Sequence, residues 1–151
     1  MTKSDPAKIV SRSAIVAATP DAIFALLVDP QRHKEIDGSG SIQSAQMSAP
    51  QRLSLHAKFG MNMKMGLRYK ITNTVVEFEE GRQIAWRHLG GHIWRYILEP
   101  LDGATKVTEQ FDWNTSRAPL ILKLRQSPRD NGIAIEKTLA NMVKLFVSYT
   151  S

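Results

Sequence analysis

Three side chains in the second half of the sequence are suited to proton transfer or to orienting a polar ligand, namely Tyr96, Glu109 and His88. Asp102-Gly103 predicts a two-residue hairpin turn, because both of its central positions favour positive φ. This turn places Tyr96 opposite Glu109 on adjacent strands. Burial of the carboxyl group among aromatic rings would raise its pKa toward the range that general acids and bases use. The same pattern also fits a structural polar pair, in which Tyr96 or a basic residue satisfies Glu109.

The rest of this hairpin divides into an apolar face and a polar face. The apolar face pairs Leu98 with Val107, Trp94 with Phe111, and His92 with Trp113. The opposite face has the pattern of a solvated surface and carries Arg95, Glu99, Lys106, Thr108, Gln110 and Asp112.

The preceding turn contains Gly90 and Gly91, and its length decides which residues share a face. A two-residue loop would pair Trp86 with Arg95 and bury a cation, so a three-residue loop with glycine in the left-handed conformation is favoured. That loop stacks three rows across three strands: Ile84, Tyr96 and Glu109; Trp86, Trp94 and Phe111; His88, His92 and Trp113.

Metal and covalent chemistry are limited by residue types. The chain has no cysteine, which excludes a thiolate nucleophile, a disulfide and a cysteine zinc site. His88 and His92 supply two imidazoles without a third ligand at a fixed spacing, whereas a metal site needs at least three donors. We interpret them as rim histidines, with ligand contact as the alternative, and expect no metal and no cofactor. His33 and His56 have no supporting context.

Short helices and a meander of strands must position these residues. A strand over 9–17 precedes a helix that starts at Thr19-Pro20-Asp21, where an N-cap hydroxyl is followed by proline. Asp29-Pro30 repeats this signal for a second short helix over 31–35. Alternating β-branched and aromatic residues then predict an antiparallel meander, with strands near 42–48, 52–59, 66–79, 83–89, 92–100 and 104–114. A change of parity within 66–79 indicates a bulge near Asn73 and leaves the inner face of that strand unassigned.

The last predicted element is a long helix that begins at Ser127-Pro128 and ends near Tyr149. Its apolar residues recur at helical spacing and form one buried stripe; they are Ile135, Leu139, Met142, Val143 and Phe146. Gly132 suggests either a close approach to the sheet or room for a ligand. The apolar segment 119–124 is interpreted as closing one end of the fold, with a weak membrane or partner contact as the alternative. Met61, Met63 and Met65 are interpreted as a pliable cavity mouth or as edge packing.

Length and charge bound the function classes. The 151 residues fit one domain over 1–151, and 42% of them are hydrophobic. The net charge of +6 comes from scattered basic residues without a nucleic-acid motif, so no nucleic-acid partner is expected. No apolar run reaches membrane-spanning length and the N-terminus lacks a secretory signal. We therefore expect a cytoplasmic protein without stable membrane insertion.

The order of elements and two local stretches resemble the START-like, Bet v 1-like superfamily (SRPBCC), in particular its polyketide cyclase/dehydrase and lipid-transport group. The stretches are 76–86, which runs Val-Glu-Phe-Glu-Glu-Gly-Arg-Gln-Ile-Ala-Trp, and 96–109, which spans Asp102-Gly103. The resemblance implies an α+β helix-grip fold, in which a curved antiparallel sheet of about seven strands wraps around the long C-terminal helix and encloses a cavity for a bulky hydrophobic molecule.

The sequence thus predicts binding or transport of a hydrophobic or aromatic small molecule, lipid-like or polyketide-like. The alternative is an enzyme of polyketide cyclase/dehydratase type that uses the same cavity, with Glu109, Tyr96 and His88 as candidate catalytic residues. The predicted ligand-binding residues are Trp86, His88, Trp94, Tyr96, Glu109, Phe111, Trp113, Leu139, Met142 and Phe146.

Overall fold

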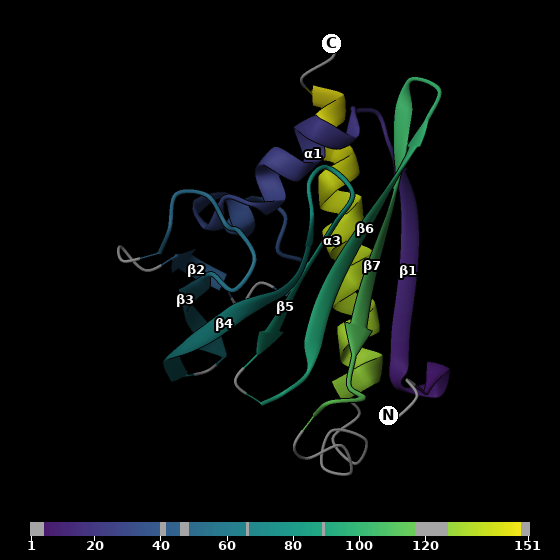
Figure 1. Ribbon diagram of the computed structural model, residues 1–151. Helices are drawn as coiled ribbons and strands as arrows, with labels where there is room; N and C mark the ends of the chain where they lie inside the picture. The colour runs from purple at the N-terminus through teal and green to yellow at the C-terminus, as the bar shows by residue number, and fades with distance from the viewer. Residues whose placement is uncertain are drawn as a thin grey trace.

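The computed structural model describes residues 5–39, 42–45, 49–65, 67–88, 90–116 and 127–148. The fold is α+β: a curved antiparallel sheet with strand order β1-β7-β6-β5-β4-β3-β2 wraps around the C-terminal helix α3, as Figure 1 shows. The helices are η1 (Pro6–Lys8), α1 (Pro20–Leu27), η2 (Pro30–Glu35) and α3 (Ser127–Ser148). The strands are β1 (Ile9–Val16), β2 (Ile42–Ala45), β3 (Lys58–Met65), β4 (Leu67–Glu79), β5 (Gln83–His88), β6 (Ile93–Leu101) and β7 (Ala104–Asp112). The helix-grip class predicted from the sequence is therefore confirmed.

The two connector helices start at the predicted caps. The Thr19 hydroxyl accepts a hydrogen bond from the Ala22 amide (3.2 Å), and the Asp29 carboxylate accepts one from the Gln31 amide (3.0 Å). A proline follows each cap at the first helical position, where its missing amide N–H costs nothing. The second connector is a 3-10 helix, so it presents its side chains with a tighter twist than an α-helix does.

Both predicted hairpin registers are confirmed. Tyr96 lies opposite Glu109 across β6 and β7, and Trp86 lies opposite Trp94 across β5 and β6. The amide of His88 donates to the carbonyl of His92 at 2.9 Å, which closes the three-residue loop. Gly91 adopts a φ of 95°, the left-handed conformation that this loop requires.

The predicted strand over 52–59 is wrong for most of its length, because β3 begins only at Lys58. The preceding segment turns inward instead. The amide of Leu53 donates to the carbonyl of Val28 (2.7 Å), and the Leu53 side chain is fully buried. Burial of this single leucine against the end of α1 outweighs the β-propensity of the segment. Met61 and Met63 consequently lie within β3 and face the interior.

The irregularity predicted near Asn73 occurs a few residues later, as a register shift between Val75 and Glu77 in the pairing of β4 with β5. Residues before the shift pair with β3 in unbroken register. The inner face of β4 is thereby assigned: Ile71, Asn73 and Val75 face the interior before the shift. Phe78 packs against the core beyond it.

The polar face of β6 and β7 is less solvated than its alternation predicts. Only 14% of the Arg95 side chain and 8% of the Asp112 side chain are exposed. The guanidinium lies along the sheet between Glu77 of β4 (2.7 Å) and Asp112 of β7 (3.3 Å). These long side chains cover one another, which is why the pattern of polar residues overstates their exposure.

Helix α3 packs against β1 and β7. Its predicted stripe is confirmed, since Ile135, Leu139, Met142 and Phe146 are buried. Gly132 allows the close approach of helix and sheet, because a Cβ at this position would lie 3.2 Å from Val10 Cγ1. The segment 119–124 falls outside the described residues.

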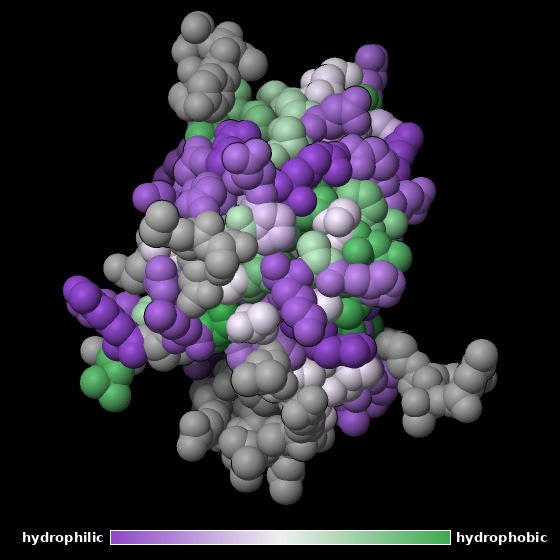
Figure 2. All heavy atoms as spheres, turned by 60° about the vertical axis from the view of Figure 1, so that its left-hand side comes forward, coloured by the Kyte–Doolittle hydropathy of each residue, from purple (hydrophilic) through white to green (hydrophobic). Residues whose placement is uncertain are grey.

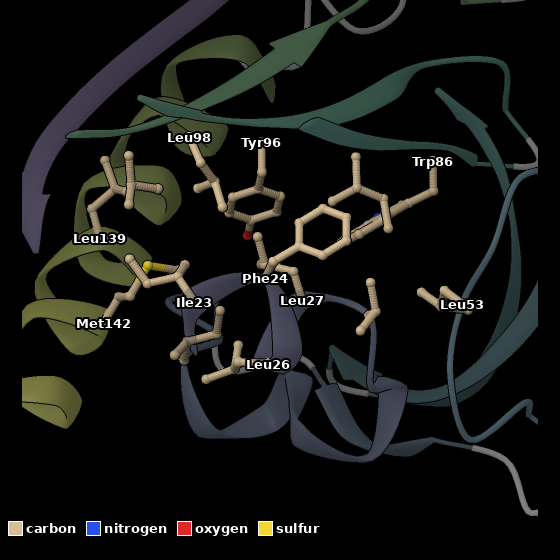
Figure 3. Packing of buried hydrophobic residues seen from close by; sticks show 14 of the residues in the cluster. Ile23, Phe24, Leu26, Leu27, Leu53, Trp86, Tyr96, Leu98, Leu139 and Met142 are labelled. Carbon is tan, nitrogen blue, oxygen red and sulfur yellow. The ribbon is translucent and has the colours of Figure 1, made fainter. Parts of the chain in front are cut away.

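Most of the apolar side chains lie in the interior. Figure 3 shows Phe24 and Leu27 of α1 facing Tyr96 and Trp86 of the sheet, with Met142 of α3 beside α1. On the face turned forward in Figure 2, hydrophilic residues are interspersed with smaller hydrophobic areas. Within the described residues, no helix is long and apolar enough to cross a membrane.

Candidate ligand cavity

A cavity of about 400 Å³ lies between the inner face of the sheet, the connector and the first turns of α3. This volume falls within the range of roughly 300–1,000 Å³ that is usual for small-molecule sites. Six of the predicted ligand-binding residues line it, namely Trp86, His88, Trp94, Tyr96, Glu109 and Phe111. They come from three adjacent strands, β5, β6 and β7, so the stacked rows inferred from the hairpins form one wall.

The other four predicted residues are not part of this wall. Leu139, Met142 and Phe146 belong to the solid core, where the middle and last turns of α3 pack beyond the cavity. The cavity instead meets the first turns of the helix, at Asp130, Asn131, Ala134 and Thr138. Trp113 lies just beyond β7 and packs against the core, and its indole Nε1 has no hydrogen-bond partner among the described residues.

Glu109 and Tyr96 form the polar centre of the wall. The Tyr96 hydroxyl donates to Glu109 Oε1 at 2.8 Å, whereas the buried Oε2 has no partner within the described part of the chain. Only 4% of Glu109 is exposed, and this burial raises its pKa to about 8, although the bond from Tyr96 opposes the shift. Glu109 is therefore mainly protonated at neutral pH. Burial also raises the pKa of Tyr96, so the phenol keeps its proton.

Asn73 is a second polar group on the wall, and the sequence did not predict it. It lies on β4 opposite Phe59 of β3 and His88 of β5, and it is 4% exposed. Its Oδ1 has no hydrogen-bond partner among the described residues. The signal that would have found it is its parity with Ile71 and Val75, which the position of the bulge obscured.

The connector supplies Asp37, which was also missed. Asp37 Oδ1 accepts from the amide (3.0 Å) and the hydroxyl (2.6 Å) of Ser39, and Oδ2 accepts from the amide of Ile42 (2.9 Å). The next residue, Gly38, fixes this loop against α3: its amide donates to Thr138 Oγ1, and a Cβ would collide with the helix backbone. The negative charge of Asp37 contributes to the raised pKa of Glu109.

His33 of η2 also lines the cavity, although its position in the sequence gave no reason to expect this. Its ring stacks on Trp86 with centroids 5.1 Å apart, and one ring nitrogen lies 2.8 Å from the carbonyl oxygen of Leu27. Burial lowers its pKa, so the ring is neutral at pH 7. His33 therefore extends the aromatic wall instead of adding a charge.

His88 and His92 stack face to face, with ring centroids 4.5 Å apart and planes 12° apart. The amide of Gly90 donates to His88 Nδ1 at 3.0 Å. Burial lowers the pKa of His88, and burial together with His88 lowers the pKa of His92 to about 4. Both rings are neutral at pH 7. In the described ranges no three His, Asp or Glu residues are grouped so that they could hold a metal ion.

A curved antiparallel sheet that grips a long C-terminal helix over an internal cavity defines the START-like, Bet v 1-like class. The family model described as polyketide cyclase / dehydrase and lipid transport matches residues 8–146, and the chain belongs to this family.

Two relatives from Mycobacterium tuberculosis, the uncharacterized proteins Rv0088 and MT0096, are 37% and 36% identical over 139 residues that cover 88% of this chain. The aligned region spans 62% of the length of these curated relatives.

Solved structures show the same fold. NE0264 from Nitrosomonas europaea gives a TM-score of 0.77 at 14% identity, covering 97% of this chain and 98% of that one. The Polyketide_cyc-like protein Cgl2372 from Corynebacterium glutamicum gives a TM-score of 0.63 at 20% identity, covering 99% and 94%. Identities this low establish the fold and leave the ligand open.

Proposed function

We propose that the protein binds or transports a hydrophobic small molecule with a planar or aromatic part, held in the cavity between the sheet and α3. The observation that carries this proposal is the wall itself: Trp86, Trp94 and Phe111 surround about 400 Å³ of space that the protein's own side chains leave open. Aromatic rings offer large apolar contact area at a small entropic cost.

The apolar wall would supply most of the affinity. Removing about 200 Å² of apolar ligand surface from water contributes about 5 kcal/mol before the cost of association. The polar groups would supply orientation, because Glu109 Oε2 and Asn73 Oδ1 are buried without partners among the described residues. A ligand that satisfies them removes a desolvation penalty that the free protein carries.

The direct test is a titration with 2-naphthalenemethanol, monitored by tryptophan fluorescence. Ala134→Leu fills the cavity from α3 without removing a core side chain, and Ala140→Leu makes the same change at an exposed position of that helix. We expect saturable binding to wild type, binding weakened about tenfold or more in Ala134→Leu because overpacking costs about 1–3 kcal/mol, and no change in Ala140→Leu. No saturable signal, or equal affinity in all three proteins, would contradict the proposal.

The second candidate function is proton-transfer catalysis of the cyclase/dehydratase type on a substrate in the same cavity. The observation that favours it is the pKa of Glu109, which at about 8 lies near the working pH of a general acid or base. Glu109 and Tyr96 would act together through their hydrogen bond, whereas His88 accepts a hydrogen bond from Gly90 and stacks on His92.

Glu109→Gln separates this candidate from simple binding, because it preserves shape and removes the titratable proton. If the protein is an enzyme of this type, wild type will accelerate deuterium exchange at the methyl group of 2-acetylnaphthalene, and Glu109→Gln will lose that acceleration while still binding the ketone. If wild type binds the ketone and the exchange rate does not exceed that in buffer, the catalytic candidate is rejected and the binding function remains.

A further inference from the structure

The cavity wall is acidic, although the chain as a whole carries a net charge of +6. Three carboxyl groups line the cavity, from Asp37 after η2, Glu109 on β7 and Asp130 on α3. Among the residues that the structure describes, no lysine or arginine lines it. A carboxylate ligand would therefore lie among acidic side chains, and no lysine or arginine of the described lining would neutralise its charge.

The oxygen atoms of this wall differ in whether they already take part in hydrogen bonds. The Tyr96 hydroxyl already donates its hydrogen bond to Glu109 Oε1. Both oxygens of Asp37 already accept hydrogen bonds, from Ser39 and Ile42. Glu109 Oε2 and Asn73 Oδ1 are buried and have no partner among the described residues. The amide oxygen of Asn73 accepts hydrogen bonds from N–H groups, and Glu109 Oε2 does so once its carboxyl group is ionised.

The aromatic rings add a second attraction for positive charge. Trp86, Trp94 and Phe111 line the same cavity, and a cation close to the face of an aromatic ring is stabilised by it. Acidic groups, unsatisfied oxygens and aromatic rings thus line one partly open cavity.

We propose that the cavity takes a hydrophobic amine as its ammonium ion, with an N–H group donating to Glu109 Oε2 and a further donor of the ligand satisfying Asn73 Oδ1. The apolar part of the amine lies against the aromatic wall. This inference rests on the proposed binding function and specifies the chemical class of the ligand.

Binding of an ammonium ion changes the charge of Glu109. The free protein holds Glu109 protonated at pH 7, because its pKa is about 8, whereas a cation beside Oε2 favours the carboxylate. Binding then releases a proton. The affinity is expected to rise about tenfold from pH 6 to pH 7, as the ionised fraction grows, and to level off above pH 8. The other titratable groups that line the cavity are Tyr96, Asp37, Asp130, His33, His88 and His92. Burial lowers the pKa of all three histidines, and that of His92 falls to about 4.

The test uses three probes of one shape that differ only in the polar end: 2-naphthylmethylamine, 2-naphthalenemethanol and 2-naphthoate. Calorimetry of the whole chain at pH 7 in phosphate and in Tris measures affinity and proton release together, since the two buffers differ in ionisation enthalpy. Glu109→Gln is compared with Glu99→Gln, an exposed acid on β6.

We expect wild type to bind the amine about tenfold more tightly than the alcohol, with the naphthoate weakest, and to release a proton only with the amine. Glu109→Gln should lose about tenfold in amine affinity and keep alcohol affinity within about twofold, whereas Glu99→Gln should match wild type. Proton release is measured on wild type, so it tests the inference even if a variant is unstable.

Two failures are distinguishable. If the alcohol or the naphthoate binds as tightly as the amine, or amine binding releases no proton, the ammonium assignment is overturned while the binding cavity stands. If none of the three probes binds, the proposed function itself fails.

Discussion

The acids on the two faces of strands β6 and β7 differ in whether they have a basic partner and in the direction in which their pKa is shifted. On the outer face, Arg95 bridges Glu77 and Asp112, and its hydrogen bond and charge lower the pKa of Glu77. On the inner face, Glu109 has a phenol and no base, and burial raises its pKa to about 8. Because side chains alternate along a strand, Arg95 of the ion-pair network and Tyr96 of the cavity wall are neighbours in β6 but lie on opposite faces of the sheet.

The acids of the outer face stabilise the fold through ion pairs, whereas the acid of the inner face keeps an oxygen available for a ligand. Each acid on the outer face has a charged partner, which is the usual condition for a charge removed from water. Glu109 instead keeps one oxygen without a partner in the described ranges, inside a cavity. An unsatisfied buried acid destabilises the free protein. Because folding raises the pKa of Glu109 and lowers that of Glu77, the contributions of the two faces to the free energy of unfolding should change with pH in opposite directions.

The largest expected effect is the pH dependence of the inner acid. The pKa of Glu109 is raised from 4.5 to about 8 on folding, so the folded state holds a proton that the unfolded state has lost between these values. Relative to Glu109→Gln, wild type should lose stability as pH rises from about 4.5 to about 8, by about 1.4 kcal/mol per pH unit and on the order of 5 kcal/mol in total, with no further loss above that range. Urea unfolding of both proteins at several pH values measures the difference. A constant difference across this range would mean that Glu109 is ionised in the folded protein throughout.

The next effect is removal of the outer cation. Arg95→Met leaves Glu77 and Asp112 close together without a counter-charge, and we expect it to cost about 3 kcal/mol in the free energy of unfolding at pH 7. The cost should shrink as pH falls below 4.5 toward the lowered folded pKa of Glu77, because protonation removes the charge that Arg95 compensates. A change smaller than 1 kcal/mol at pH 7 would show that solvent already screens this network.

The smallest effect is expected at the rim of the same face. Lys106 and Glu99 form a longer contact of 3.8 Å with about half of each side chain exposed. Lys106→Met should change stability by less than about 0.5 kcal/mol, since exposed pairs contribute little. It is the matched control for Arg95→Met, and a comparable loss in both would remove the distinction between the buried network and its surface.

The hairpin part of the site could be predicted from the sequence because its register depends on the residues of the turns themselves. Asp102-Gly103 fixes one turn and thereby pairs Tyr96 with Glu109. Keeping Arg95 off the apolar face fixes the other turn and pairs Trp86 with Trp94. The caps at Thr19 and Asp29 are equally local. These elements were confirmed for the same reason: their geometry depends on neighbours in the chain and across one turn.

The remainder of the site depends on tertiary packing. Asn73 stayed hidden because the register shift between Val75 and Glu77 inverts the parity of its strand. His33 and Asp37 reach the wall only because the connector folds against the sheet and α3. The apolar stripe of α3 packs into the core, whereas the cavity borders Asp130, Asn131, Ala134 and Thr138, which the apolar pattern does not single out.

The crystal structure of the protein with 2-naphthalenemethanol tests the central claim most directly. We expect density for the naphthalene ring among Trp86, Trp94 and Phe111, with the hydroxyl within hydrogen-bonding distance of Glu109 Oε2 or Asn73 Oδ1. Density confined to the outer surface at saturating probe, or protein side chains filling the cavity, would contradict it.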